Sequence, residues 1–175
     1  MEVVLIRHTS VDVPKYVFYG QTDVPLRSTF EQEACDVQAR LSHYTFDKVY
    51  TSPLSRCVKL ANYCGFSNAE RDNRILELNF GDWEMKDCRN IHDSNLQAWY
   101  DDYANVKTTN GESFSDQYQR VSNFLDELKN KTYQHVAIFA HGGVLACAQI
   151  YAGIQTQEEA FEFLTPYGGI VTFQL

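Results

Sequence analysis

The sequence predicts a single domain over residues 1–175, with a three-layer α/β/α fold and a mostly parallel central sheet. Two continuous apolar runs, residues 3–6 and 136–140, are typical of parallel strands that are buried on both faces. Segments with apolar residues at helical spacing alternate with such runs, and no repeat, linker or low-complexity stretch interrupts them. A chain of 175 residues also lies within the usual length of one domain.

The first strand, at residues 3–6, is expected to lead into a long loop. Residues 9–28 contain two prolines and a glycine and have no steady periodicity, and loops of this length are usually functional. A helix is predicted after Ser28, which is expected to be its N-cap, because apolar residues recur at helical spacing over residues 30–41.

A second strand, at residues 48–51, is expected to run directly into another helix. Ser52 as N-cap and Pro53 as the first helical residue are typical of a helix start, and Gly65 is expected to end that helix. This assignment places Arg56 in the first turn of the helix, beside the end of the strand.

Residues 76–112 are less regular and rich in aromatic side chains, with a short helix expected near residues 94–104. We expect this segment to be an excursion over the sheet. From Ser113, a capping-box pattern precedes an amphipathic stripe, which predicts a long helix packed on the sheet.

The C-terminal third repeats the pattern of the start of the chain. The apolar strand at residues 136–140 is followed by His141-Gly142-Gly143 and by an apolar helix over residues 144–152. Residues 168–175 alternate in polarity and are expected to form the last strand.

Composition excludes several classes of function. The net charge of −8 argues against nucleic acid as a partner, because phosphate-backbone binding requires a surplus of Lys and Arg. No segment approaches the roughly 20 apolar residues of a membrane span, and the start of the chain does not resemble a signal peptide. The five cysteines form no C-x-x-C pair, so we expect reduced thiols and a cytoplasmic protein.

Polar residues follow three of the predicted strands and are expected to meet at one edge of the sheet. Ligands of open α/β sheets bind outside the carboxyl ends of the strands. Arg7 and His8 follow the first strand, Arg56 follows the second, and His141 and Gly142 follow the strand at residues 136–140. Guanidinium groups and a helix N-terminus both favour anions, so these residues predict a phosphate site.

Phosphoryl chemistry at such a site needs a nucleophile and a proton donor. We expect His8 to attack phosphorus, because the adjacent Arg7 disfavours the charged form of its imidazole. His141 is expected to stabilise the transferring group. Glu77, between two leucines, is the best candidate for the acid that protonates the leaving oxygen.

Four motifs resemble, in order and spacing, those of the histidine phosphatase superfamily, in the branch that contains the phosphoglycerate mutases. The resemblance covers essentially the whole chain and implies a phosphoglycerate mutase-like fold. It also implies that His8 becomes phosphorylated, that Arg7, Arg56 and His141 bind the phosphoryl oxygens, and that Glu77 is the acid and then the base for water. The motifs are Leu5-Ile6-Arg7-His8, Ser52-Pro53-Leu54-Ser55-Arg56-Cys57, Leu76-Glu77-Leu78-Asn79-Phe80-Gly81-Asp82-Trp83-Glu84 and Ala140-His141-Gly142-Gly143.

The first motif departs from the family pattern. Thr9 occupies the position after the histidine where the family usually has glycine, and Pro14 falls about where the family often has a phosphate-binding asparagine. The hydroxyl groups of Thr9 and Ser10 are therefore candidate substitutes for the missing contacts. Gln21 and Thr22, in the long loop, are further candidates for contact with the substrate.

These features predict a metal-independent phosphomonoesterase that works through phosphohistidine, with no cofactor and a small-molecule phosphomonoester as its partner. The stretches 77–85 and 110–113, with the region of Trp99, are most similar to family members that remove a 5′-phosphate in cobalamin synthesis. A broad-specificity phosphatase or a mutase-like enzyme is one alternative, and an inactive phospholigand-binding module is another. Neither the C-x5-R motif of cysteine phosphatases nor a P-loop motif occurs.

Overall fold

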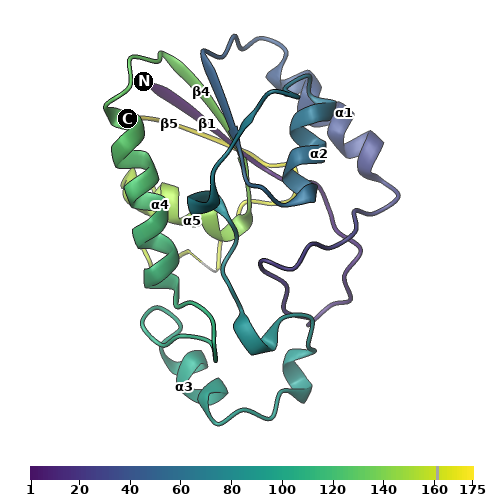
Figure 1. Ribbon diagram of the computed structural model, residues 1–175, viewed down its shortest axis with the longest axis vertical. Coiled ribbons are helices and arrows are strands. Elements are labelled where there is room, and N and C mark those ends of the chain that lie inside the picture. The colour runs from purple at the N-terminus through teal and green to yellow at the C-terminus, as the bar shows by residue number, and fades with distance from the viewer. Residues whose placement is uncertain (161) are drawn as a thin grey trace.

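The computed structural model describes residues 1–160 and 162–175 and contains one five-stranded sheet between two layers of helices (Figure 1). The strand order is β3-β2-β4-β1-β5. Four strands run parallel, and β5 pairs antiparallel with β1 at one edge. This is the mixed α/β, mostly parallel architecture that the sequence predicts. The strands are β1 (Glu2–Arg7), β2 (Lys48–Thr51), β3 (Glu70–Arg71), β4 (His135–Ala140) and β5 (Ile170–Gln174).

Helices cover both faces of the sheet, which is why the central strands are apolar throughout. Successive side chains of a strand point to opposite faces. Accordingly, Val3 and Leu5 of β1 pack in a core with α4 and α5, and Val4 and Ile6 pack in a second core with α1 and α2. The helices are α1 (Phe30–Leu41), α2 (Ser55–Tyr63), α3 (Asn95–Asp101), α4 (Phe114–Lys129) and α5 (Gly142–Tyr151).

Two predicted helix starts are wrong. The N-cap of α1 is Thr29 rather than Ser28, and the hydroxyl of Thr29 donates to the Glu33 carboxylate instead of capping the helix. The N-cap of α2 is Leu54, so this helix begins later than Ser52-Pro53 predicts. The Ser52 hydroxyl contacts His141 across the sheet edge, and this long-range contact has no local signal in the sequence.

Other predicted boundaries are confirmed. Gly65 follows the end of α2 with φ +93°, a left-handed conformation that glycine adopts without steric cost. At the start of α4, Ser113 and Asp116 form the predicted capping box, in which each side chain binds the backbone N–H of the other residue. The short β3 is not predicted, because its two residues are charged and exposed.

Residues 76–112 extend beyond the sheet as a separate excursion, drawn in teal below the strands in Figure 1. The segment contains α3 and short 3₁₀ helices, and its aromatic side chains pack against the loop over residues 9–28. Phe18 from that loop stacks on Phe80, with ring centroids 4.9 Å apart, and meets Trp99 edge to face. The loop and the excursion therefore form one wall beside the carboxyl ends of the strands. Within the described residues, no helix combines the length and the apolar composition needed to cross a membrane.

Candidate active site

His8 and His141 lie side by side at the carboxyl edge of the sheet. β1 and β4 pair in parallel with Arg7 opposite Ala140, so the residues that follow the two strands are neighbours. The two imidazole centroids are 5.2 Å apart, with an angle of 64° between the ring planes. Both side chains are buried. The structure thus brings together two histidines that are more than 130 positions apart in the chain.

The tautomer of His8 follows from a single contact. Its Nδ1 lies 2.7 Å from the carbonyl oxygen of Thr9. A carbonyl oxygen can only accept, so Nδ1 carries the hydrogen and Nε2 has a free lone pair. Burial, together with the charge of Arg56 and more weakly that of Arg7, lowers the pKa of His8 to about 3. The ring is therefore neutral near pH 7, and Nε2 is available as a nucleophile.

His141 has the opposite tautomer. Arg56 Nε donates to His141 Nδ1 at 3.3 Å, so the ring hydrogen is on Nε2 and is directed to Ser52 Oγ, 2.7 Å away. Burial, and then the positive charge of Arg56, lowers the pKa of His141 well below its usual value. Both ring nitrogens are engaged within the protein. His141 would have to exchange Ser52 for a phosphoryl oxygen in order to act as the sequence predicts.

Arg56 is completely buried, and every nitrogen of its guanidinium group has a contact. Besides His141, it donates to the carbonyl oxygens of Gly20 at 2.5 Å and Thr22 at 3.0 Å. These partners are in the long loop that follows β1. Arg56 therefore connects the loop to the pair of histidines, and its charge remains beside both imidazoles.

Arg7 is the cationic residue among the side chains that line a pocket at the start of α5. Its NH1 donates to Thr165 O at 2.5 Å, and its guanidinium lies 4.2 Å from the centroid of the Tyr167 ring. Its buried Nε has no partner among the described residues. A Cβ atom at Gly142 would lie 3.0 Å from the guanidinium carbon, so the start of α5 packs directly on this side chain.

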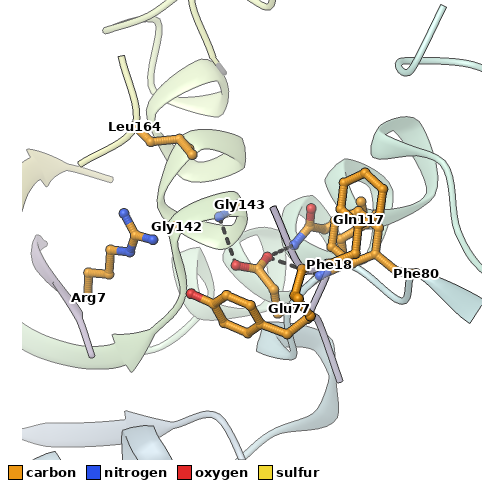
Figure 2. Close-up of a pocket in the computed structure, with 11 residues that line it drawn as sticks. Arg7, Phe18, Glu77, Phe80, Gln117, Gly142, Gly143 and Leu164 are labelled. Atoms are coloured by element: carbon orange, nitrogen blue, oxygen red, sulfur yellow. Dashed lines mark hydrogen bonds between the residues drawn. The ribbon is translucent and has the colours of Figure 1, made fainter. Parts of the chain in front are cut away.

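Glu77 lies across the pocket from Arg7, with the start of α5 between them (Figure 2). Its Oε1 accepts hydrogen bonds from the backbone N–H of Leu78 at 3.0 Å and from Gln117 Nε2 at 2.8 Å. Its Oε2 accepts one from the N–H of Gly143 at 3.1 Å. The pocket has a volume of about 180 Å³. It is lined by Arg7, Val17, Phe18, Tyr19, Glu77, Leu78, Phe80, Gln117, Gly142, Gly143 and Leu164.

Two tyrosines from distant segments lie beside Arg7 at one end of the pocket. Tyr19 OH and Tyr167 OH are 2.5 Å apart. The ring of Tyr167 lies over Arg7 and has its centroid 5.5 Å from that of His8. Burial and the hydrogen bond with Tyr167 raise the pKa of Tyr19. This pair limits access to His8, whose exposed fraction is 2%.

The four predicted substrate-contact residues do not line the pocket. Thr9 is buried, and its hydroxyl has no partner among the described residues. Ser10 binds Glu33 on α1 through its backbone N–H at 2.8 Å and through its hydroxyl. Gln21 and Thr22 contact Glu84 through their backbone N–H groups, and the Gln21 amide donates to the backbone oxygen of Glu77 at 3.1 Å.

Sequence reasoning did not identify Gln117, Tyr19 or Tyr167 as part of the site. One feature of the sequence indicates a role for Gln117: it is a polar residue within the apolar stripe of α4. In the structure its side chain is completely buried. No sequence pattern indicates a role for Tyr19 or Tyr167, since each lies in an irregular loop and their contact depends on how the two loops fold together.

Two guanidinium groups, two neutral imidazoles and a carboxylate gather at the carboxyl edge of a mostly parallel sheet. Arg7 and Glu77 line the pocket there, whereas His8, His141 and Arg56 are buried beside it and are not among its lining residues. The chain belongs to the histidine phosphatase superfamily, branch 1, whose family model matches residues 3–175. Membership of this family indicates phosphatase or mutase activity.

Solved structures of particular enzymes are similar to the chain over nearly its whole length. The alpha-ribazole phosphatase of Shigella flexneri is 28% identical with a TM-score of 0.89, and the match covers 100% of this chain and 91% of that one. A protein of Escherichia coli, provisionally assigned as an alpha-ribazole-5′-P phosphatase, is 27% identical with a TM-score of 0.87, over 98% and 89% of the two chains. A phosphoglycerate mutase of Thermus thermophilus is 25% identical with a TM-score of 0.79, over 99% and 93%. No curated protein sequence matches the chain.

Proposed function

We propose that the protein is a metal-independent phosphoric monoester hydrolase that transfers the phosphoryl group through His8. The observation that supports this most strongly is the contact between His8 Nδ1 and Thr9 O, which leaves Nε2 unprotonated. A buried imidazole with a free lone pair beside two guanidinium groups has the properties that nucleophilic attack on a phosphate ester requires.

The first step forms a bond between His8 Nε2 and phosphorus and breaks the bond between phosphorus and the ester oxygen. Glu77, as the carboxylic acid, gives its proton to the departing oxygen, so the alcohol leaves as a neutral molecule. The imidazole gains positive charge, which the hydrogen bond from Nδ1 to Thr9 O stabilises. Arg7, Arg56 and the N-terminus of α5 at Gly142 stabilise the charge on the phosphoryl oxygens.

The second step reverses the roles. Water attacks phosphorus, the Glu77 carboxylate accepts the proton of that water, and the bond to Nε2 breaks. Inorganic phosphate and neutral His8 are the products, and Glu77 is again the acid. His141 stabilises the phosphoryl group in both steps after exchanging its contact with Ser52.

The lining of the pocket supports an uncharged leaving group. Apart from Arg7, the lining among the described residues includes no Lys or Arg, and most of its side chains are apolar or aromatic. A phosphoglycerate carries a carboxylate beside its phosphate, and that charge would be buried without a partner. This favours hydrolysis of a neutral-alcohol phosphate over the mutase reaction.

The finer proposal is that the substrate is alpha-ribazole 5′-phosphate, an intermediate of cobalamin biosynthesis. The similarity to the Shigella flexneri alpha-ribazole phosphatase supports it. The aromatic wall formed by Phe18 and Phe80 is also suited to a planar base. All five cysteines are free thiols, which supports action in a reducing compartment such as the cytoplasm.

His8→Ala tests the mechanism, with His43→Ala at an exposed histidine as the matched control. We expect His8→Ala to lower kcat/KM by roughly 10³-fold or more, and His43→Ala and added EDTA to change it little. Rapid acid-free quenching should trap acid-labile phosphate on the wild-type protein and none on His8→Ala. Full activity of His8→Ala, or loss of activity in EDTA, would contradict the proposal.

A phosphate-release screen tests the substrate. We expect the highest kcat/KM for alpha-ribazole 5′-phosphate among sugar, nucleotide, glycerate and aryl phosphates. A flat profile would instead identify a broad-specificity phosphatase, and isomerisation of phosphoglycerate would identify a mutase. Failure to release phosphate from any of these compounds would identify a binding module.

A further inference from the structure

Gln117 on α4 is a completely buried amide on the wall of the pocket. Its Nε2 donates to Glu77 Oε1 at 2.8 Å, but its own Oε1 has no partner among the described residues. Buried polar atoms nearly always have a partner, so an unpaired carbonyl oxygen needs an explanation. A leucine or methionine at this position would fill the same space without burying an unpaired oxygen. The donor side of the amide is therefore the feature that accounts for a glutamine here.

The hydrogen bonds to Glu77 are distributed unequally between its two oxygens. Oε1 accepts two N–H groups, from Leu78 and Gln117, whereas Oε2 accepts one, from Gly143 (Figure 2). A carboxylate oxygen has two lone-pair positions in its plane, so both positions on Oε1 are occupied. One position remains open in the whole carboxylate, and it is on Oε2.

We propose that Gln117 is a positioning residue that confines the catalytic proton of Glu77 to Oε2. This inference rests on the proposed function, in which Glu77 gives a proton to the leaving oxygen and later takes one from water. In the hydrogen-bond pattern of the structure, a proton on Oε1 would point at the N–H group of Leu78 or of Gln117. With Gln117 in place, Oε2 is the oxygen that donates in the first step and accepts in the second.

The packing around Gly143 holds this arrangement in place. A Cβ atom at Gly143 would lie 2.4 Å from Glu77 Oε1, and 2.8 Å and 2.9 Å from the two amide atoms of Gln117. The carboxylate and the amide therefore both lie against the backbone at the start of α5. Any side chain at position 143 would displace both groups, so this arrangement requires glycine there.

Gln117→Met tests the proposal, because methionine keeps the volume but removes both the donor and the unpaired oxygen. Gln119→Met is the matched control, since Gln119 is on the same helix and is exposed. The rate of phosphohistidine formation is measured by rapid quench with an alkyl phosphate and with p-nitrophenyl phosphate. The nitrophenolate ion leaves without a proton, so its departure does not depend on which oxygen of Glu77 is protonated.

We expect Gln117→Met to slow phosphorylation by the alkyl phosphate about tenfold and phosphorylation by p-nitrophenyl phosphate less than threefold, with KM within about twofold of wild type. The unfolding temperature should stay the same or rise, because the unpaired oxygen has been removed. Gln119→Met should change none of these rates.

Equal slowing of both substrates by Gln117→Met, or no slowing of either, would overturn the proposal while leaving the phosphohistidine mechanism intact. Absence of phosphohistidine in the wild-type protein would instead overturn the proposed function. Gln117→Leu is the second variant if the methionine variant does not fold, and the same two substrates decide its outcome.

Discussion

At the scale of single residues, the proposed role of His8 as nucleophile depends on contacts that act on different properties of the ring. Thr9 O decides which nitrogen carries the hydrogen. Burial and the charge of Arg56 lower the pKa of the ring, so that it stays neutral. Neutrality alone would not leave a free lone pair on Nε2, because a neutral ring in the other tautomer carries its hydrogen on that nitrogen.

The buried histidines make stability depend on pH. The pKa of folded His8 is about 3, and that of an unfolded histidine is 6.5. Between these values the unfolded chain binds a proton that the folded protein does not, so acidification favours unfolding. His141 acts in the same direction. We expect the free energy of unfolding in urea to fall between pH 6.5 and 5 by about 1.4 kcal/mol per pH unit for each of the two residues.

The comparison variant is His8→Gln, which removes one of the two titrating groups. Its stability should fall less steeply than that of the wild type over the same pH range, by about 1.4 kcal/mol per pH unit. Carboxylates contribute at lower pH, where they are protonated in the unfolded chain. A wild-type stability that is constant from pH 7 to 5 would contradict the buried, neutral state of both rings.

The two adjacent glycines at the start of α5 should have separable effects. A Cβ atom at Gly143 would lie 2.4 Å from Glu77 Oε1, so Gly143→Ala must displace the carboxylate. We expect it to lower kcat for alkyl phosphates about 100-fold. A Cβ atom at Gly142 would lie 3.0 Å from the guanidinium of Arg7, which can shift slightly. We expect Gly142→Ala mainly to raise the inhibition constant of inorganic phosphate, several-fold. Identical changes in kcat and in phosphate affinity for the two variants would argue against this division of roles.

Which site residues could be predicted follows from how each one is positioned. Arg7, His8 and His141 lie at the ends of apolar strands, and the carboxyl ends of parallel strands meet at one edge whatever the loops do. Gln117 reaches the pocket from the first turn of α4, where its neighbours depend on how α4 packs on α5. That packing has no local signature in the sequence.

At the scale of elements, one carboxylate binds three successive residues in the second half of the loop after β1. Glu84 accepts hydrogen bonds from the backbone N–H of Gly20, Gln21, Thr22 and Phe80, at 2.9 to 3.2 Å. Burial alone would raise the pKa of Glu84, but these backbone donors hold it below its usual value. The ordered loop in turn presents two carbonyl oxygens to Arg56.

Glu84→Ala should therefore affect a site that Glu84 does not touch. Without the carboxylate, the loop loses its fixed position and Arg56 loses two ordered acceptors. We expect kcat/KM to fall by roughly tenfold to 100-fold and the free energy of unfolding to fall by about 1 to 3 kcal/mol. Glu31→Ala, at an exposed position on α1, is the control. Urea unfolding and phosphate inhibition measure the two effects, and a stable variant with wild-type phosphate affinity would contradict the role of this loop.

Elements with a strong periodic pattern could be predicted, and the loop could not. The central strands and α4 agree closely with the ranges expected from apolar runs and from the capping box. The loop over residues 9–28 takes its shape from Glu84 and from the excursion, more than 50 residues further along the chain. Gln21 and Thr22, which the sequence predicts as substrate contacts, bind Glu84 through their backbone N–H groups and do not line the pocket.

At the scale of the whole molecule, the charge distribution is uneven. The protein has a net charge of −8, yet it buries Arg56 completely and keeps Arg7 within the pocket. No carboxylate forms an ion pair with either guanidinium among the described residues. Their hydrogen bonds go to backbone oxygens and to His141, which do not neutralise their positive charge.

The two tryptophans of the chain both lie in the aromatic wall beside the pocket. Trp83 and Trp99 have ring centroids 5.6 Å apart, and Trp99 also contacts both Phe18 and Phe80, which line the cavity. Intrinsic fluorescence excited at the indole band therefore reports on this wall and not on the sheet. Titration with a non-hydrolysable phosphonate that carries an aromatic group should quench or shift the emission, whereas inorganic phosphate should leave it nearly unchanged. Tryptophan fluorescence can therefore report binding at the aromatic wall of the pocket without an added label.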